Sequence, residues 1–355
     1  MDCLPLTEAV ERTQKDQAMR WTAWLKRWMS PTRHRRVRRS RRSDCGRHAA
    51  LVQTLENRLL LTASHPLDLA TLEGDSGFQI HGIDLDDLAG QSLSFVGDIN
   101  GDGVDDIVLG ASGADPGMRS KAGESYVVFG QTTEFTEVLD LSTLDGSNGF
   151  RLDGHDSGDE SGRSASTAGD FNNDGFDDLL IGAHVADPRG VINAGETYVV
   201  FGTSQTLPAT VDLATLDGSG GFRITGTGTD DQSGRSVSNA GDFNGDGIDD
   251  IAIGAWRADT DSHIDSGATY IVFGTTADQD PILDLALLDG SNGLRLDGTQ
   301  QADWSGHRVS TAGDINGDGI DDLLIGAFGA DPEGRRQAGE SYVVFGSRQP
   351  FSASV

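Results

Sequence analysis

The chain has 355 residues and is acidic, with 56 Asp and Glu residues against 27 Lys and Arg residues and a formal net charge of −29. Residues 1–66 carry 14 Lys and Arg and 6 Asp and Glu, a net charge of +8, so the rest of the chain has a net charge of −37. So acidic a region disfavours nucleic acid as a partner and favours cations. No run of 18 apolar residues occurs, so no transmembrane segment is expected.

The first 66 residues are predicted to be a basic leader or export segment, largely disordered. Residues 33–42 (RHRRVRRSRR) could belong to a nucleic-acid-binding arm, but an export or anchoring segment fits better with the acidic remainder. Both cysteines, Cys3 and Cys45, lie in this segment, so no disulfide is expected beyond it. Residues 55–61 (LENRLLL) resemble a Leu-Glu-x-Arg-x-Leu-Leu leader motif of some bacterial surface and secreted proteins. We therefore expect an extracellular or cell-surface protein of a bacterium.

Residues 67–355 are built from a repeat of 72 residues. Segments before and after each acidic loop recur at the same interval, so we place the repeats at 68–139, 140–211, 212–283 and 284–355. A fixed long period indicates a solenoid, a propeller or an array. The most regular part of the repeat is an acidic loop with the pattern D-x-N-x-D-G-x-x-D. The four copies are DINGDGVDD (98–106), DFNNDGFDD (170–178), DFNGDGIDD (242–250) and DINGDGIDD (314–322).

Each acidic loop has the ligand spacing of a calcium site. Oxygen ligands at positions 1, 3 and 5 of a tight turn converge, Gly at position 6 supplies the bend, and position 7 offers a backbone carbonyl. Position 9 adds a further carboxylate, and without an ion the carboxylates would repel one another. A metal-free, solvated acidic turn is the alternative. The predicted calcium ligands in the four sites are Asp98, Asn100, Asp102, Val104 and Asp106; Asp170, Asn172, Asp174, Phe176 and Asp178; Asp242, Asn244, Asp246, Ile248 and Asp250; and Asp314, Asn316, Asp318, Ile320 and Asp322.

The residues after each loop distinguish these sites from EF-hand or dockerin loops. An EF-hand has an acidic residue at position 12 and continues into a helix. Here position 12 is Leu109, Ile181, Ile253 or Ile325, within an apolar run that is too short for a helix and ends at Gly. The loops are therefore predicted to connect two strands.

Each repeat contains four segments of strand length. For the second acidic loop these are residues 164–169, 179–183 and 197–201, followed by residues 221–225. The apolar segment TYVVF (197–201) suggests burial on both faces, and no segment has a sustained helical period. The sequence therefore predicts an all-β fold in which each repeat is one four-stranded blade.

The strand ends carry a family resemblance. Phe-Gly follows the third strand and Gly-Ala ends the second, as in Phe129-Gly130 and Gly110-Ala111, with the calcium turn before the second strand. Over about residues 68–346 the chain resembles the FG-GAP repeats of the N-terminal β-propeller of integrin α-chains. That propeller has seven blades, so four repeats form either a closed four-bladed ring or an open arc of a larger ring. In a closed ring the strand at 78–80 would complete the last blade beside 342–345; an open arc would self-associate.

The repeat region lacks a recognisable catalytic set. Its histidines, His81, His155, His184, His263 and His307, do not recur at the period and are expected at the surface, so we do not expect an enzyme. The resemblance implies a calcium-binding, integrin-like module for adhesion or recognition outside the cell. Two alternatives remain: a calcium-dependent carbohydrate-binding lectin, and a non-catalytic appendage of a polysaccharide-active or phospholipase-type enzyme.

The predicted ligand face lies opposite the calcium loops. In a blade the turns between strands one and two share one face, and the turns between strands two and three share the other. Just after the second strand, one column of the repeat changes from Ser112 to His184, Trp256 and Phe328, while the scaffold columns stay constant. Drift at unconstrained loop positions would give the same variation. We expect a protein or glycan ligand at His184, Trp256, Arg257, Trp304 and Phe328.

Overall fold

The computed structural model describes residues 69–72, 74, 76–260 and 262–352, and the predicted leader at 1–66 lies outside this part of the chain. Every regular element in it other than a strand is a single turn of 3-10 helix. None of its helices has the length and hydropathy needed to cross a membrane. The short helices are η1 (Leu69–Thr71), η2 (Pro116–Met118), η3 (Leu141–Thr143), η4 (Pro188–Gly190), η5 (Leu213–Thr215), η6 (Leu285–Leu287) and η7 (Pro332–Gly334).

The strands form four blades and one separate pair. In each blade the strands follow one another antiparallel from the inner to the outer edge, as the repeat predicts. The first blade contains β2 (Ser92–Gly97), β3 (Asp106–Ala111), β4 (Glu124–Val128) and β6 (Gly149–Asp153), and the second contains β7 (Ser164–Gly169), β8 (Asp178–Ala183), β9 (Glu196–Val200) and β11 (Gly221–Thr225). The third contains β12 (Ser233–Gly241), β13 (Asp250–Ala255), β14 (Ala268–Val272) and β16 (Gly293–Asp297), and the fourth contains β17 (Ser305–Gly313), β18 (Asp322–Ala327) and β19 (Glu340–Val344).

Two blades carry a fifth strand that the sequence analysis did not predict. β10 (Thr210–Asp212) pairs in parallel with β6, and β15 (Ile282–Asp284) pairs in parallel with β11. Each of these strands follows the third strand of one blade and pairs with the outer strand of the preceding blade, so it ties the two blades together. With three residues, such a strand is too short to show the alternation that identifies a strand in a sequence.

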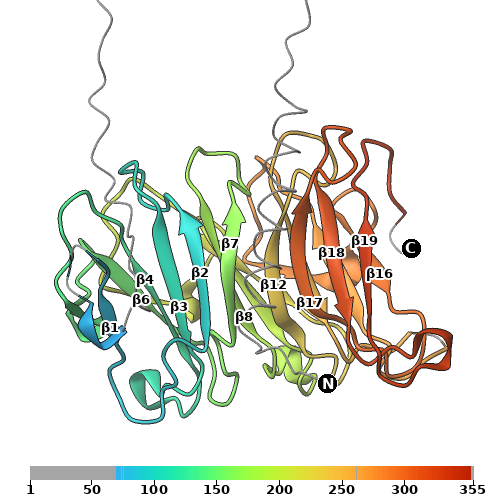
Figure 1. Cartoon of the computed structure of the whole chain (residues 1–355), viewed down its shortest axis with the longest axis horizontal. Helices are drawn as coiled ribbons and strands as arrows, with labels where there is room; N and C mark the ends of the chain where they lie inside the picture. Colours follow the sequence, from blue (N-terminus) through green and yellow to red (C-terminus); the bar gives the residue numbers. More distant parts are fainter. Residues whose placement is uncertain (1–68, 73, 75, 261, 353–355) are drawn as a thin grey trace, which may run out of the picture. The chain divides into compact units, whose positions relative to one another are not determined.

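The inner strands β2, β7, β12 and β17 lie side by side, and the blades pack face to face (Figure 1). Successive side chains of a strand point to opposite faces of its sheet. Leu179 and Ile181 of β8 therefore pack with Val108 of the first blade, whereas Leu180 packs with Ile251 of the third. Burial on both faces explains why the second and third strands of a blade are continuous apolar runs.

The glycine of each Gly-Ala pair is required by this packing. A Cβ atom on Gly110, Gly182 or Gly254 would overlap the backbone carbonyl of Gly162, Gly234 or Gly306 in the next blade. The second strand of one blade can therefore approach the first strand of the next only because these positions lack a side chain.

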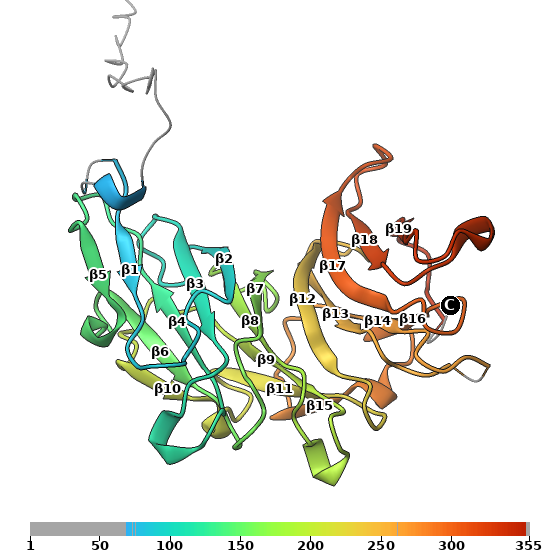
Figure 2. The ribbon, with the colours of Figure 1, turned by 60° about the horizontal axis from the view of Figure 1, so that its bottom comes forward.

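The blades form an open arc, so the closed four-bladed ring is wrong (Figure 2). β1 (Gln79–His81) pairs in parallel with β5 (Val138–Asp140) and not with β19, which it was expected to complete. The pair Gln79 and Val138 has the register of Arg223 and Ile282 in β11 and β15. β1 thus has the position of an outer strand in a blade preceding the first.

Candidate calcium loops and ligand-binding face

The four acidic loops connect the first and second strands of their blades and are shaped by their own side chains. Asp98 at position 1 accepts hydrogen bonds at Oδ1 from the backbone N–H groups of Gly101 (2.8 Å) and Asp102 (3.0 Å), and at Oδ2 from Gly103 (2.8 Å). The fourth loop repeats these bonds from Asp314 to the same three positions. The first carboxylate is therefore turned into the loop, where a cation ligand has to lie.

Positions 3 and 5 also point inward. In the first loop Asn100 Oδ1 accepts from Asp102 N–H (2.8 Å), and Asp102 Oδ1 accepts from Val104 N–H (2.9 Å). Positions 4 and 6 have positive φ angles, 75° at Gly101 and 85° at Gly103. Glycine adopts this conformation without strain, and the second loop uses Asn173 (φ 56°) at position 4 because Asn tolerates it better than most residues.

The carboxylate at position 9 is fully buried and fastens the loop to the blade. Asp106 accepts at Oδ2 from Ile99 N–H (3.1 Å) and at Oδ1 from Gly130 N–H (2.8 Å), where Gly130 is the glycine of the Phe-Gly pair after β4. Burial is the main cause that raises the pKa of Asp106 to about 6 and the pKa values of Asp178 and Asp250 to about 8. A cation in the loop would favour the ionised form of these groups.

Neighbouring loops are joined by the carboxylate at position 8, which the sequence analysis did not assign. Asp177 Oδ2 accepts from Asp98 N–H (2.9 Å), and the same bond joins Asp249 to Asp170 (3.0 Å) and Asp321 to Asp242 (3.0 Å). The loops therefore lie together along one face of the arc. The sequence contained an indication of this contact, because every loop ends in two consecutive aspartates. The sequence analysis assigned a function only to the second of them.

The donor set of the loops fits a calcium ion. Every group that the loops direct inward is a carboxylate or amide oxygen, which hard cations prefer, and position 7 adds a backbone carbonyl. In the third loop Asp242 Oδ1 is buried and has no hydrogen-bond partner among the described residues. A buried carboxylate oxygen without a partner is costly, and a bound cation would satisfy it.

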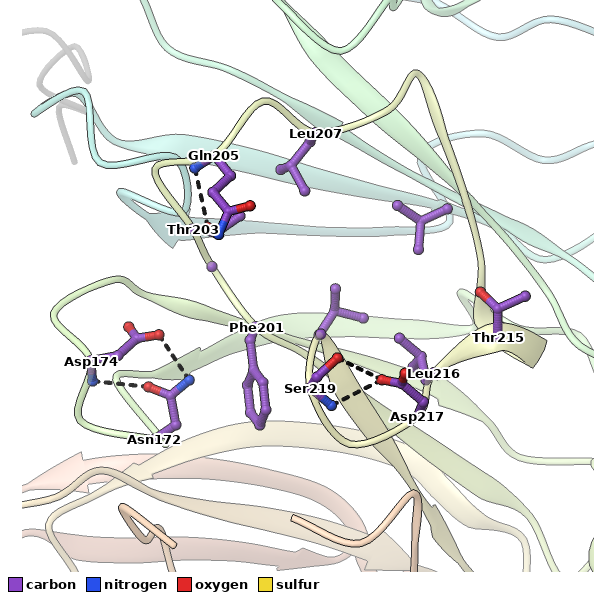
Figure 3. A pocket seen from close by; sticks show the side chains of 14 residues that line it. Asn172, Asp174, Phe201, Thr203, Gln205, Leu207, Thr215, Leu216, Asp217 and Ser219 are labelled. Carbon is purple, nitrogen blue, oxygen red and sulfur yellow. Dashed lines mark hydrogen bonds between the residues drawn. The ribbon is translucent and has the colours of Figure 1, made fainter. Parts of the chain in front are cut away.

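A cavity of about 580 Å³ opens beside the second loop (Figure 3). Asn172 and Asp174 form one part of its lining and are hydrogen-bonded to each other (3.0 Å). The ring of Phe201 and the hydrogen-bonded pair Ser219 and Asp217 (2.7 Å) form the opposite part. This opening makes the second loop accessible from solvent.

A further cluster of side chains that could bind a metal lies at the second blade, and its glutamate is already ion-paired. The ligand atoms of His155, Asp159 and Glu196 lie within 4.8 Å of one another. Glu196, however, accepts a hydrogen bond from the Tyr198 hydroxyl (2.6 Å) and forms an ion pair with Arg223 (3.2 Å). The charge of Glu196 is therefore compensated within the second blade.

Three of the five predicted ligand residues form an aromatic cluster: Trp256 and Phe328 follow the second strands of their blades, and Trp304 lies on the connection between β16 and β17. The ring centroid of Trp304 lies 5.9 Å from that of Trp256 and 4.9 Å from that of Phe328, whose side chain is 49% exposed. The Arg257 guanidinium lies 5.8 Å from the Trp256 ring and forms an ion pair with Asp265 (3.2 Å). The repeat thus brings Trp256, Arg257, Trp304 and Phe328 together at the junction of the third and fourth blades.

The two histidines of this region differ from the expectation of surface residues. His184 is buried, with 8% of its surface exposed, and burial lowers its pKa to about 3, so the surface position expected for it is wrong. His307, which was expected at the surface and was not predicted as a ligand residue, is partly buried and packs between Trp256 (5.4 Å) and Phe328 (4.5 Å). The 72-residue spacing could have identified His307, because it occupies the column of Arg163 and Arg235.

Comparison with known proteins agrees with this architecture. The sequence profile of the FG-GAP repeat matches residues 89–128, 161–200, 233–272 and 305–344, which contain the first three strands and the acidic loop of every blade. Integrin alpha-5 of Xenopus laevis is 29% identical over 250 residues, which cover 69% of this chain and 20% of that protein. Integrin alpha pat-2 of Caenorhabditis elegans is 27% identical over 275 residues, covering 76% of this chain and 20% of that protein.

A second kind of relative is an enzyme. Phosphatidylinositol-glycan-specific phospholipase D of Bos taurus is 32% identical over 178 residues, which cover 49% of this chain and 19% of the enzyme. The chain thus spans about a fifth of the length of these curated relatives. The similarity to the enzyme concerns this part of its length alone.

Proposed function

This chain is an FG-GAP repeat protein with integrin-α-like repeats, and on that basis we propose that it is a calcium-binding recognition module located outside the cell or at its surface. The observation that carries the proposal is the set of four loops with inward-facing carboxylates, joined along one face by the bonds between Asp177 and Asp98 and their equivalents. Calcium would be held by positions 1, 3, 5, 7 and 9 of each loop and would neutralise charges that otherwise repel one another.

In this proposal calcium has a structural role. Each loop joins the two innermost strands of a blade, and its position-9 aspartate reaches the end of the third strand. An ion bound in the loop would therefore stabilise three strands of its blade, and through the position-8 carboxylate the neighbouring loop. Calcium titration of the folded chain, with and without chelator, tests this role.

We propose that the recognition face is the aromatic cluster of Trp256, Trp304 and Phe328 with Arg257. Aromatic side chains together with an arginine are the typical composition of binding hot spots, and a half-exposed Phe328 leaves apolar surface for a partner. The ligand is a protein or a glycan. A glycan array and a pull-down from surface extracts, each with calcium and with chelator, would identify the class.

The lectin alternative receives support from the same cluster, because indole rings offer flat apolar surfaces on which sugar rings stack. Under this alternative the chain binds carbohydrate in a calcium-dependent manner. A non-catalytic role beside an enzymatic domain is the remaining alternative, in view of the similarity to part of a phospholipase. We assign no catalytic activity to the repeats themselves.

We also propose that the open arc self-associates through its end strands. Among the described residues nothing pairs with the outer edge of β19, and Val343 and Phe345 there are 43% and 56% exposed. β1 has the register of β11, which pairs with β9 through Arg223 and Tyr198. The corresponding contact would place Gln79 of one copy beside Tyr342 of another, which would cover both open edges.

A further inference from the structure

Three arginines on the inner strands lack an acidic partner. Arg163 directly precedes β7, Arg235 lies in β12 and Arg308 lies in β17. Salt bridges within residues 69–352 involve seven other arginines, and none involves these three. This is unexpected in a region with a net charge of −37, where carboxylates are abundant. The charges of these three residues are therefore available to an anion from outside.

The strand register brings these arginines together. In the third blade Arg235 lies in a bulge of β12. The bulge separates Ser233, which pairs with Ala255, from Ser236, which pairs with Gly254. In the fourth blade the equivalent bulge ends at Arg308, which pairs with Gly326. Since β7, β12 and β17 are adjacent (Figure 1), Arg163, Arg235 and His307, which are 72 residues apart, occupy equivalent positions on neighbouring blades, and Arg308 follows one residue later. Burial lowers the pKa of Arg235 to about 10, and the charges of Arg163 and Arg308 add to this effect.

His184 supplies an independent indication of a ligand. Its side chain is more than nine-tenths buried, and its Nδ1 atom has no hydrogen-bond partner among the described residues. The charges of Arg235 and Arg163 are near enough to disfavour protonation of this imidazole. A buried polar atom without a partner is uncommon in proteins and suggests a group that is satisfied only when a ligand is bound.

His307 connects the three arginines to the aromatic cluster. Its ring packs on Trp256 and Phe328, and it lies close to the charges of Arg235, Arg308 and Arg163. His307 therefore links the aromatic cluster of the third and fourth blades to the column of Arg163 and Arg235, and these side chains together make up the candidate surface. A ligand on this surface would meet flat apolar rings on one side and guanidinium groups on the other.

We propose that this surface binds an acidic carbohydrate, that is, a sugar ring carrying a carboxylate or sulfate group. The inference rests on the proposed recognition face and adds the chemistry of its ligand. Trp256 and Trp304 would stack on the sugar ring, while Arg163 and Arg235 would form charge-assisted hydrogen bonds with the anionic group. A long polyanion such as nucleic acid is disfavoured because the surrounding chain is strongly acidic.

Binding assays with the complete chain in calcium test the proposal. The probes are an oligogalacturonate carrying carboxylates, a sulfated oligosaccharide, a neutral galactose oligomer and hexaglutamate. We expect at least one acidic sugar to bind, and the neutral sugar and hexaglutamate to bind at least about tenfold more weakly. Binding of hexaglutamate in preference to both acidic sugars, or no binding of either acidic sugar, would overturn the proposal.

Variants separate this inference from the proposed recognition face. Arg235→Gln should weaken binding of the acidic sugar at least about tenfold, as expected for loss of a charge-assisted contact. Arg189→Gln is the matched control, because Arg189 pairs with Asp284 in β15, at the outer edge of the second blade. If Trp256→Ala abolishes binding while Arg235→Gln leaves it unchanged, the recognition face stands and the anion site is wrong. Equal loss in Arg189→Gln and Arg235→Gln would contradict a local site.

Discussion

The backbone N–H of Asp98 donates a 2.9 Å hydrogen bond to Oδ2 of Asp177, a residue 79 positions later in the chain and in the next blade. The same bond recurs between the second and third loops and between the third and fourth. Each acidic loop is thus both a candidate ion site and a contact between blades. Ion binding and blade packing are therefore expected to be coupled.

Removing this contact should destabilise the junction between the first two blades. We expect Asp177→Ala to lower the free energy of unfolding by about 1.5–3 kcal/mol, the usual effect of a hydrogen bond to a charged group. Asp105→Ala is the matched control, since Asp105 has the same place in the first loop but its side chain has no hydrogen-bond partner within the described residues. Denaturant unfolding in calcium measures both variants, and equal effects would contradict the role of Asp177.

The glycine of the Gly-Ala pair should tolerate a methyl group only in the last blade. Gly182→Ala places Cβ against the Gly234 carbonyl and should cost about 1–3 kcal/mol of stability, as overpacked sites do. At the equivalent Gly326 the nearest atom to a new Cβ is Arg308 Cβ at 3.7 Å, so Gly326→Ala should be nearly neutral. Thermal unfolding compares the two, and a neutral Gly182→Ala would show that the blades are not packed as described.

The buried imidazole of His184 predicts a pH dependence of stability. Its folded pKa of about 3 is lower than its ordinary value of 6.5, so the unfolded chain binds more protons between these values. Its contribution is present above pH 6.5 and is lost as the pH falls, by up to about 1.4 kcal/mol per pH unit. The difference in unfolding free energy between the native chain and His184→Gln should therefore change between pH 6.5 and 4. Parallel stability curves would contradict this account.

The open ends predict a concentration-dependent association. Light scattering should show a mass above that of the 37.5 kDa monomer at high concentration, and Val343→Lys should reduce it, because a charge on an edge strand opposes pairing. The variant should keep the calcium stoichiometry of the native chain. A compact monomer at every concentration, for both proteins, would argue against association through β1 and β19.

The positions of the strands and the residues of the acidic loops could be predicted from the sequence, because each has a characteristic local pattern of residues. The second blade follows the prediction to within one residue, since alternating polar loops and apolar runs recur at 72 residues. β10 and β15 could not be predicted, because three-residue strands have no period and each pairs with the outer strand of the preceding blade.

The contacts between repeats could not be predicted from local sequence patterns either. Nothing next to Asp177 in the sequence indicates that it bonds to Asp98, and the clustering of His307 with Trp256 depends on which strands become neighbours. The sequence left both a closed ring and an open arc possible for the same reason. Whether β1 meets β19 depends on the summed angles between blades, which no single repeat encodes.

Calcium stoichiometry is the most direct test of the central claim. Isothermal titration of the metal-free chain should give four calcium ions per chain, with the affinity of about 10⁻⁴–10⁻³ M that is usual of extracellular sites, and calcium should raise the melting temperature. Asp102→Ala and Asp246→Ala should each reduce the count to three, while Asp105→Ala should leave it at four. Saturation at zero or one ion, or unchanged counts in the first two variants, would contradict the account.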